Sequence, residues 1–233
     1  FNHTGLYEAD LKTISGDFIA KFDIGEMAGG TIGMVVGAEY SHTSFDQLND
    51  PESNALQIAG SAGGDNINAE RARKSAFFEM GLPFTEKLTT SIAGRYDEYS
   101  SSGIGSNFSP SINMAYRPTS WVLLRGTYGE GFRVGAFSQL YGNRSESFPS
   151  GVDVVGCAAG VAVCTPTQYR TLSGGNPNLG PEESEHYTFG AVLSPLPELT
   201  IQIGMWHTEY PGYITTNSLQ REFNAESRGE TNY

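Results

Sequence analysis

The sequence predicts an all-β protein: part of the wall, about 8–9 strands, of an antiparallel up-and-down transmembrane β-barrel. Eight segments alternate apolar and polar residues, which is the pattern of strands with one apolar face and one polar face. The connections between them alternate short and long, which is typical of barrels with tight turns at one rim and loops at the other. Glycine supplies 29 of the 233 residues, which favours many turns, and no apolar run reaches the length of a membrane helix.

The first four strands are expected at 14–24, 31–45, 70–82 and 88–99. In the third, Ala76 and Phe78 share the apolar face, while Arg71, Arg73 and Glu79 lie on the polar face. Short turns are expected near 25–30 and 83–87, and a long polar loop at about 46–69 separates the second and third strands.

The last four strands are expected at 107–116, 121–131, 184–194 and 199–210. The fifth has Phe108, Ile112 and Met114 on one face, against Asn107 and Ser111 on the other. Between the sixth and seventh lies the longest connection, about 132–183, which is expected to lack regular structure. A loop of roughly fifty residues is uncommon in a compact domain and is usually functional.

Charge and cysteine content narrow the function. The formal net charge of −12 argues against a nucleic-acid partner. Cys157 and Cys164, the only cysteines, lie together in the longest connection and predict a local disulfide in an oxidising compartment; two free thiols are the alternative. The four histidines are scattered without metal-ligand spacing, so no metal site and no cofactor are expected. No catalytic serine, histidine and aspartate arrangement or phosphate loop is recognisable, so no enzymatic activity is expected.

Four stretches resemble the barrel of TonB-dependent outer-membrane receptors. Residues 124–133 (LRGTYGEGFR), followed by Leu140-Tyr141, resemble the family run R-x-x-Y-x-x-G-F-R-x-P…L-Y. Residues 175–182 (GNPNLGPE) resemble G-N-P-x-L-x-P-E, and 93–100 and 36–40 resemble family barrel strands. The resemblance covers roughly 14–216, and the motifs are specific in combination. Val134-Gly135 stand where the family usually has Ala-Pro, which makes the local turn the point of departure.

The resemblance implies a receptor in the outer membrane of a Gram-negative bacterium. It would bind a small molecule, such as a siderophore, cobalamin or an oligosaccharide, and import it with energy from a TonB complex that acts on a plug domain. Such receptors close a barrel of about 22 strands. The whole chain, 1–233, is therefore expected to be a partial barrel domain from a longer receptor, in contact with membrane lipid.

Candidate functional residues follow from these expectations. Wall residues expected to face the plug are Glu79, Arg95, Asp97 and Arg125. Arg133 and Glu182, at the two ends of the longest connection, are expected to fix it. Ligand contacts are expected from that connection, which carries aromatic and charged groups suited to gripping a ligand; the candidates are Arg144, Phe148, Tyr169 and Arg170.

Two alternatives remain from the sequence alone. A passive porin-like barrel would share the strand pattern, and a soluble carbohydrate-binding β-sandwich would also alternate apolar and polar residues. A plug domain would separate the receptor from the porin, and detergent-dependent solubility of the full-length protein would separate both from the sandwich.

Overall fold

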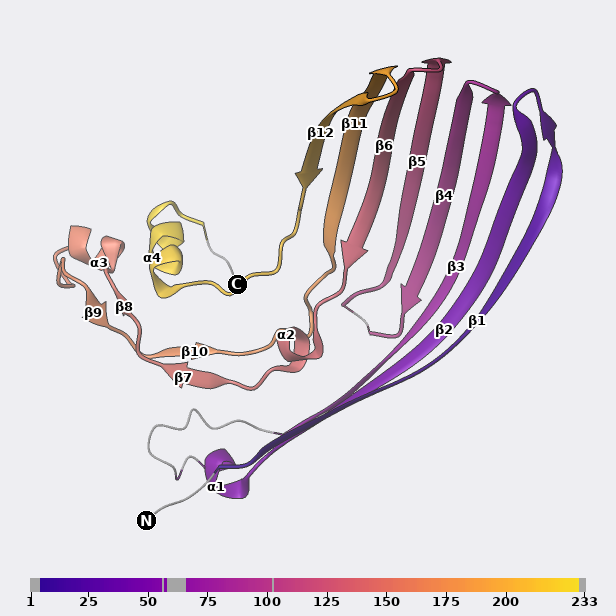
Figure 1. The fold of residues 1–233 in the computed structure, drawn as a ribbon. Helices are drawn as coiled ribbons and strands as arrows, with labels where there is room; N and C mark the ends of the chain where they lie inside the picture. Colours follow the sequence, from indigo (N-terminus) through magenta and orange to yellow (C-terminus); the bar gives the residue numbers. More distant parts are fainter. Residues whose placement is uncertain (1–4, 56, 58–65, 102, 231–233) are drawn as a thin grey trace.

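A computed structural model describes residues 5–55, 57, 66–101 and 103–230. Its main feature is one curved antiparallel sheet of eight strands, in the order β1-β2-β3-β4-β5-β6-β11-β12 (Figure 1). The sheet is an up-and-down wall that does not close on itself, so the predicted partial barrel is confirmed. Its strands are β1 (Tyr7–Met27), β2 (Gly30–Asn49), β3 (Ile67–Thr85), β4 (Leu88–Tyr99), β5 (Ser106–Thr119), β6 (Val122–Arg133), β11 (Glu182–Leu196) and β12 (Leu199–Glu209).

The strands are mostly longer than the sequence predicts. Only β4 has the expected bounds; β1 and β2 extend well beyond the membrane-length segments. Their added ends pair with each other from Tyr7 opposite Asn49 onward. The sequence also allows a separate earlier strand near Leu6 to Leu11, because Tyr7, Ala9 and Leu11 alternate with charged residues. Its apolar residues are at odd positions, whereas those of 14–24 are at even positions, so the two segments do not form one continuous pattern. The structure joins them in one unbroken strand.

Cross-strand register places the predicted polar positions on one face. Glu39 lies opposite Ser75, which lies opposite Asp97, which lies opposite Asn107. The other face carries large exposed apolar side chains, for example Phe18 at 68% and Ile203 at 61% exposure. A membrane barrel has an apolar outer face and a polar inner face. We therefore call the apolar face of this sheet the lipid face and the polar face the lumen face.

The connections sort onto two rims. Tight turns join β1 to β2, β3 to β4, β5 to β6 and β11 to β12 at one rim (Figure 1). Gly30 opens β2 with φ 134, a backbone conformation that favours glycine. The longer connections leave from the other rim, which we call the loop rim.

The expectation of an unstructured longest connection was wrong. It contains the helix α2 (Phe137–Tyr141), a ribbon of β7 (Ser145–Ser147) with β10 (Thr171–Ser173), and a second ribbon of β8 (Ser150–Gly151) with β9 (Thr167–Gln168) around α3 (Val154–Ala158). These ribbons have only two or three residue pairs each, too few to give a periodic sequence signal.

The remaining helices are α1 (Pro51–Asn54) and α4 (Leu219–Ser227), the latter capped by the Ser218 hydroxyl, which accepts a hydrogen bond from the Arg221 amide. Among the described residues, no helix is both long enough and apolar enough to span a membrane.

Candidate functional site

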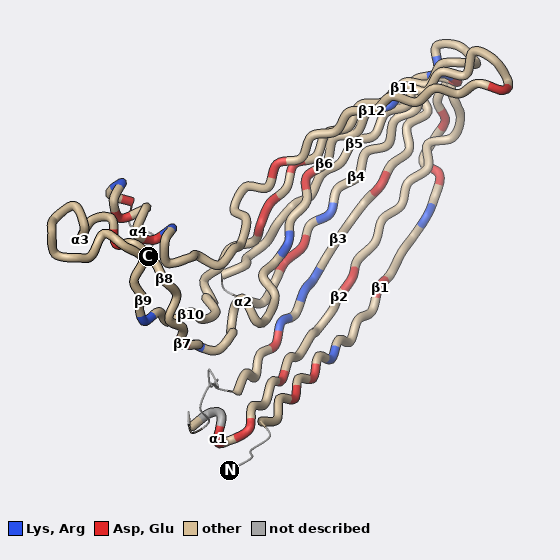
Figure 2. The backbone as a smooth tube through the Cα atoms, turned by 60° about the vertical axis from the view of Figure 1, so that its left-hand side comes forward, with Lys and Arg blue, Asp and Glu red and all other residues tan. Residues whose placement is uncertain are grey.

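A charged cluster crosses three strands on the lumen face. Its members are Glu39 of β2, Arg73 and Ser75 of β3, and Arg95 and Asp97 of β4. They meet because the register places Glu39, Ser75 and Asp97 opposite one another in one row across the sheet. Arg73 and Arg95 each lie two residues before that row on their own strand, and therefore on the same face. Figure 2 shows acidic and basic positions interleaved across these strands.

Asp97 is the centre of this cluster and is only 2% exposed. Its carboxylate accepts from Arg95 Nε at 3.0 and 3.1 Å and from the Ser75 hydroxyl at 2.5 Å. Arg95 Nη2 also donates to Glu39 at 2.7 Å, and Arg73 forms an ion pair with Glu39. Two arginines and two carboxylates leave the cluster without net charge, so its charges satisfy one another within the wall.

The four predicted plug-facing residues thus fall into two groups. Arg95 and Asp97 are on the lumen face but bond to each other. Glu79 is exposed on the same face, and no hydrogen bond or ion pair involves it within the described part of the chain. Arg125 lies over Gly190, the residue opposite it on β11. Glu39 was not singled out from the sequence because only the strand register brings it to Arg73 and Arg95.

The base of the longest connection is held against the lumen face at α2. Arg71 Nη1 donates to the Gly135 carbonyl at 2.9 Å, and its guanidinium lies 4.8 Å from the Phe137 ring centroid. Phe137 also stacks on Phe45 of β2, at 5.5 Å between ring centroids. In the sheet, β4 and β5 separate β3 from β6, so the chain leaving β6 crosses inward over its neighbours. We call this contact the α2 anchor.

Arg133 and Glu182, the predicted loop-fixing pair, lie opposite each other on β6 and β11 and form an ion pair. The second carboxylate oxygen of Glu182 accepts from the Ile214 amide at 2.6 Å. Glu182 therefore joins the two ends of the longest connection to the segment that follows β12.

The tip of the longest connection packs against α4. Tyr169 meets Phe223 edge to face, with ring centroids 5.0 Å apart. Gln220 bonds to both the amide and the carbonyl of Val152, at 2.9 and 3.1 Å. The connection after β6 and the segment after β12 consequently form one assembly, joined at its base by Glu182 and at its tip by α4.

The strand pairing brings three of the four predicted ligand-binding residues near one another. Phe148 lies across from Tyr169 and Arg170, because Ser147 pairs with Thr171 and Ser150 with Gln168. Arg170 pairs with Glu146 across the β7–β10 ribbon at 2.5 Å, and this guanidinium holds the pKa of the Glu146 carboxyl below its ordinary value. Phe148 is exposed, and Arg144 packs its stem against Gly174. The ligand roles of these residues stay predictions. Cys157 and Cys164 are joined in a disulfide, with their Cα atoms 5.1 Å apart, at the end of α3.

A cleft of about 1020 Å³ lies between the two halves of this assembly. One side comes from α2 and the β7–β10 ribbon, including Ser147, Thr171 and Ser173. The opposite side comes from the segment after β12 and the start of α4, including Thr216 and Glu222. None of the predicted ligand-binding residues lines it. The sequence analysis favoured arginine and aromatic residues as ligand contacts, whereas the lining combines serine, threonine, asparagine and glutamine with apolar residues such as Leu179 and Ile214.

Within the part of the chain that the structure describes, no group of three or more histidine, cysteine, aspartate or glutamate side chains has the arrangement of a metal site.

Known proteins resemble this chain over part of their length. It is 29% identical over 129 residues to a probable TonB-dependent siderophore receptor, PirA, from Acinetobacter baumannii, covering 55% of this chain and 16% of the relative. It is 31% identical over 134 residues to a hemin receptor from Yersinia pestis, covering 52% of this chain and 18% of that protein.

Solved structures share the fold. The siderophore receptor PirA from A. baumannii superposes with a TM-score of 0.68 at 20% identity, covering 87% of this chain and 27% of that one. A ferric enterobactin receptor from Pseudomonas aeruginosa, in complex with enterobactin, gives 0.66 at 19% identity with the same coverage. The chain spans about a sixth of the curated relatives and about a quarter of these structures. A family model described as TonB dependent receptor-like, beta-barrel matches residues 2–233, and the chain belongs to this family.

Proposed function

We propose that this chain is part of the barrel domain of an outer-membrane receptor that binds a scarce small molecule with its outer loops and imports it with TonB-derived energy. The family match over residues 2–233 carries the proposal. The names of the relatives, a siderophore receptor and a hemin receptor, support the class of cargo. Siderophores, cobalamin and oligosaccharides are the ligand types to test, and the Gram-negative outer membrane is the proposed location.

The fold supports two parts of this role, the contact with the membrane and the outer position of the loops. The lipid face carries large exposed apolar side chains on β1, β5, β11 and β12, such as Phe18, Phe108, Phe189 and Ile203, which suit contact with acyl chains. The longest connection, about 132–183, becomes an outer loop on this proposal, and the α2 anchor draws its base over the lumen. A loop assembly at the mouth of a barrel is where a ligand first meets the protein.

On the lumen face, the proposal assigns contact with a plug domain to Glu79 and Arg125. Both face the lumen outside the self-neutralised cluster, so their charges can pair with polar groups on a plug. Arg95 and Asp97 contribute to the same wall by bonding to each other.

The test uses the full-length receptor in its native outer membrane. Uptake of a radiolabelled iron chelate or sugar is measured in cells with and without a working TonB complex. The proposal expects uptake that stops when either the receptor or TonB is deleted, while binding to whole cells persists without TonB. Uptake that continues without TonB would favour a passive barrel, and the absence of binding to cells would refute the receptor role.

A further inference from the structure

The cleft between the two outer connections has a frame fixed at both ends. At its base, Glu182 bonds to Ile214, which itself lines the cleft. At its tip, Gln220 bonds to Val152 and Phe223 packs on Tyr169, next to the lining residue Leu219. Because these contacts fix the two connections to each other at both ends of the cleft, the cleft exists before a ligand binds, as in a preorganised binding site.

The size of the cleft matches a ligand rather than a few waters. Its volume of about 1020 Å³ is at the upper end of the range for small-molecule sites, roughly 300–1,000 Å³. A ferric chelate or an oligosaccharide of several sugars is of the size that such a space can enclose.

Among the described residues that line the cleft, every side chain but one is uncharged. Hydroxyl and amide groups on both sides, such as Thr171, Ser173, Thr216 and Asn217, can each donate and accept hydrogen bonds. Leu172 and Ile214 add apolar contact. The exception is Glu222, and no lysine, arginine or histidine is among the described residues that line the space.

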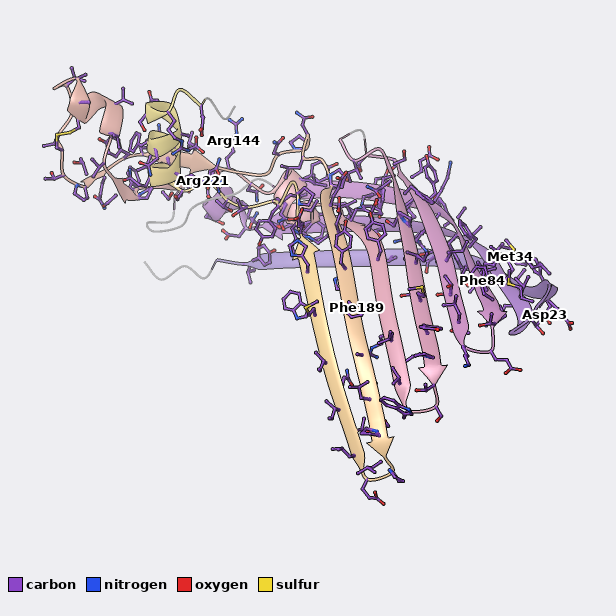
Figure 3. All side chains as sticks on the ribbon, turned by 90° about the horizontal axis from the view of Figure 1, so that it is seen from above. Asp23, Met34, Phe84, Arg144, Phe189 and Arg221 are labelled. Carbon is purple, nitrogen blue, oxygen red and sulfur yellow. A yellow bond between two sulfur atoms is a disulfide. The ribbon has the colours of Figure 1, made fainter. Side chains whose placement is uncertain are left out.

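The arginines of these connections are not among the described residues that line the cleft. Arg170 is paired with Glu146, and the stem of Arg144 (labelled in Figure 3) lies against the lining residue Gly174. Arg221 belongs to α4, where Figure 3 labels it. It is not among the lining residues of the cleft, whereas its neighbour in sequence, Glu222, is. A multiply anionic ligand would therefore enter without a cationic partner and would face a carboxylate.

Building on the proposed function, we infer that this cleft binds an uncharged, oxygen-rich small molecule and discriminates against polyanionic ligands. Hydroxyl and amide groups satisfy the oxygens of a neutral ferric trihydroxamate or of a neutral oligosaccharide, because both present acceptors and donors without net charge. Against a triply anionic ferric tris-catecholate, repulsion from Glu222 at about 10 Å in water corresponds to about a tenfold loss of affinity.

The experiment measures binding to the purified full-length receptor at low ionic strength with three probes: a neutral ferric trihydroxamate, maltohexaose and a ferric tris-catecholate. At least one uncharged probe is expected to bind about tenfold or more tightly than the catecholate. Which uncharged probe binds identifies the source of the ligand. Tightest binding of the catecholate, or no binding of either uncharged probe, overturns the inference.

Three variants test the assignment to this cleft. Thr216→Trp fills the cleft from an exposed lining position and should weaken binding of the uncharged probe at least about tenfold. Thr165→Trp is its matched control, because Thr165 is an exposed loop threonine outside the lining and should leave affinity unchanged. Glu222→Lys should raise affinity for the catecholate. Unchanged binding of the uncharged probe to Thr216→Trp overturns the assignment to this cleft.

The result also separates this inference from the proposed function. TonB-dependent uptake of the catecholate, with no binding of an uncharged probe, would leave the receptor role standing and refute the ligand class. If no probe that binds the receptor is taken up in a TonB-dependent manner, the receptor role itself is refuted.

Discussion

The α2 anchor gives the sharpest quantitative prediction. Arg71→Met keeps the aliphatic stem but removes the charged donor to the Gly135 carbonyl and the cation over the Phe137 ring. A hydrogen bond from a charged group contributes about 1.5 kcal/mol at the low end, as suits this partly buried site. The cation–π contact adds about 0.5 kcal/mol. We expect α2 to detach more easily by about 2 kcal/mol, which is a factor of about 30 in the opening equilibrium.

Hydrogen exchange in the full-length receptor measures that equilibrium directly. The amides of Gln139 and Leu140 bond to the Ala136 carbonyl at 2.9 and 3.0 Å, so they exchange when α2 opens. Their protection should fall about 30-fold in Arg71→Met, while the amides of β3 keep theirs. Arg117→Met is the control, because Arg117 lies at the turn rim, away from α2.

Two results would refute this reasoning. A change in protection below about threefold at both amides would mean that Arg71 does not hold α2. An equal loss of protection along β3 would mean that the substitution unfolds the wall rather than releasing the loop.

Three further predictions concern the other contacts. Glu182→Ala should release the segment after β12, because the Ile214 amide loses its acceptor, and hydrogen exchange at Ile214 should become faster. Asp97→Asn should lower the free energy of unfolding by about 2 kcal/mol, less than for a fully buried pair because both arginine partners are about a third exposed; urea titration of the receptor in detergent checks this. The Arg170 guanidinium lowers the pKa of the Glu146 carboxyl. The ion pair is therefore complete above the ordinary carboxyl pKa and is lost as the pH falls through the lowered value. Protection of the β7–β10 ribbon from hydrogen exchange, corrected for intrinsic exchange rates, should fall over that acidic range.

Each of these predictions has a control. Asp23→Asn removes an exposed lumen-face carboxylate near the turn rim, outside the cluster, and should leave the free energy of unfolding within about 0.5 kcal/mol of the parent. A loss equal to that of Asp97→Asn would assign the effect to lumen charge in general. Arg170→Gln should abolish the acid dependence of the ribbon, and the same dependence in that variant would rule out the Glu146 contact as its cause. Unchanged exchange at Ile214 in Glu182→Ala would show that this bond does not hold the segment.

The sequence predicted the wall well because the signal for a strand at a water–lipid boundary is local. In residues 88–99, Leu88, Ile92 and Tyr96 lie on the face opposite to polar and charged residues such as Arg95 and Asp97, and β4 has the predicted bounds. Contacts between strands were harder to predict, because they depend on register. Glu39 and Arg73 are far apart in the sequence, and only the pairing of β2 with β3 brings their charges together.

The loops were predicted least completely, for a physical reason. The β7–β10 ribbon and the contact of α4 with the loop tip depend on packing between segments distant in sequence, and neither leaves a periodic pattern. The cleft has the same origin. Its lining of serine, threonine and asparagine is common on any surface, so residue type alone did not point to it.

The charged cluster has a consequence for how the barrel assembles. Strand side chains alternate between faces, so a slip of β3 by one residue would turn Arg73 from the lumen toward the acyl chains. Arg73 lies opposite Tyr99, the last residue of β4, so it lies near the loop rim, where an arginine on the lipid face costs about 0–1 kcal/mol. The slipped pairing would also separate Arg73 from Glu39 and Asp97, while Asp97 would keep Arg95 of its own strand. During insertion, misaligned pairings of these three strands are therefore penalised by the lost ion pairs as well as by the membrane. The cluster therefore favours the observed register of β2, β3 and β4, whether or not a ligand is bound.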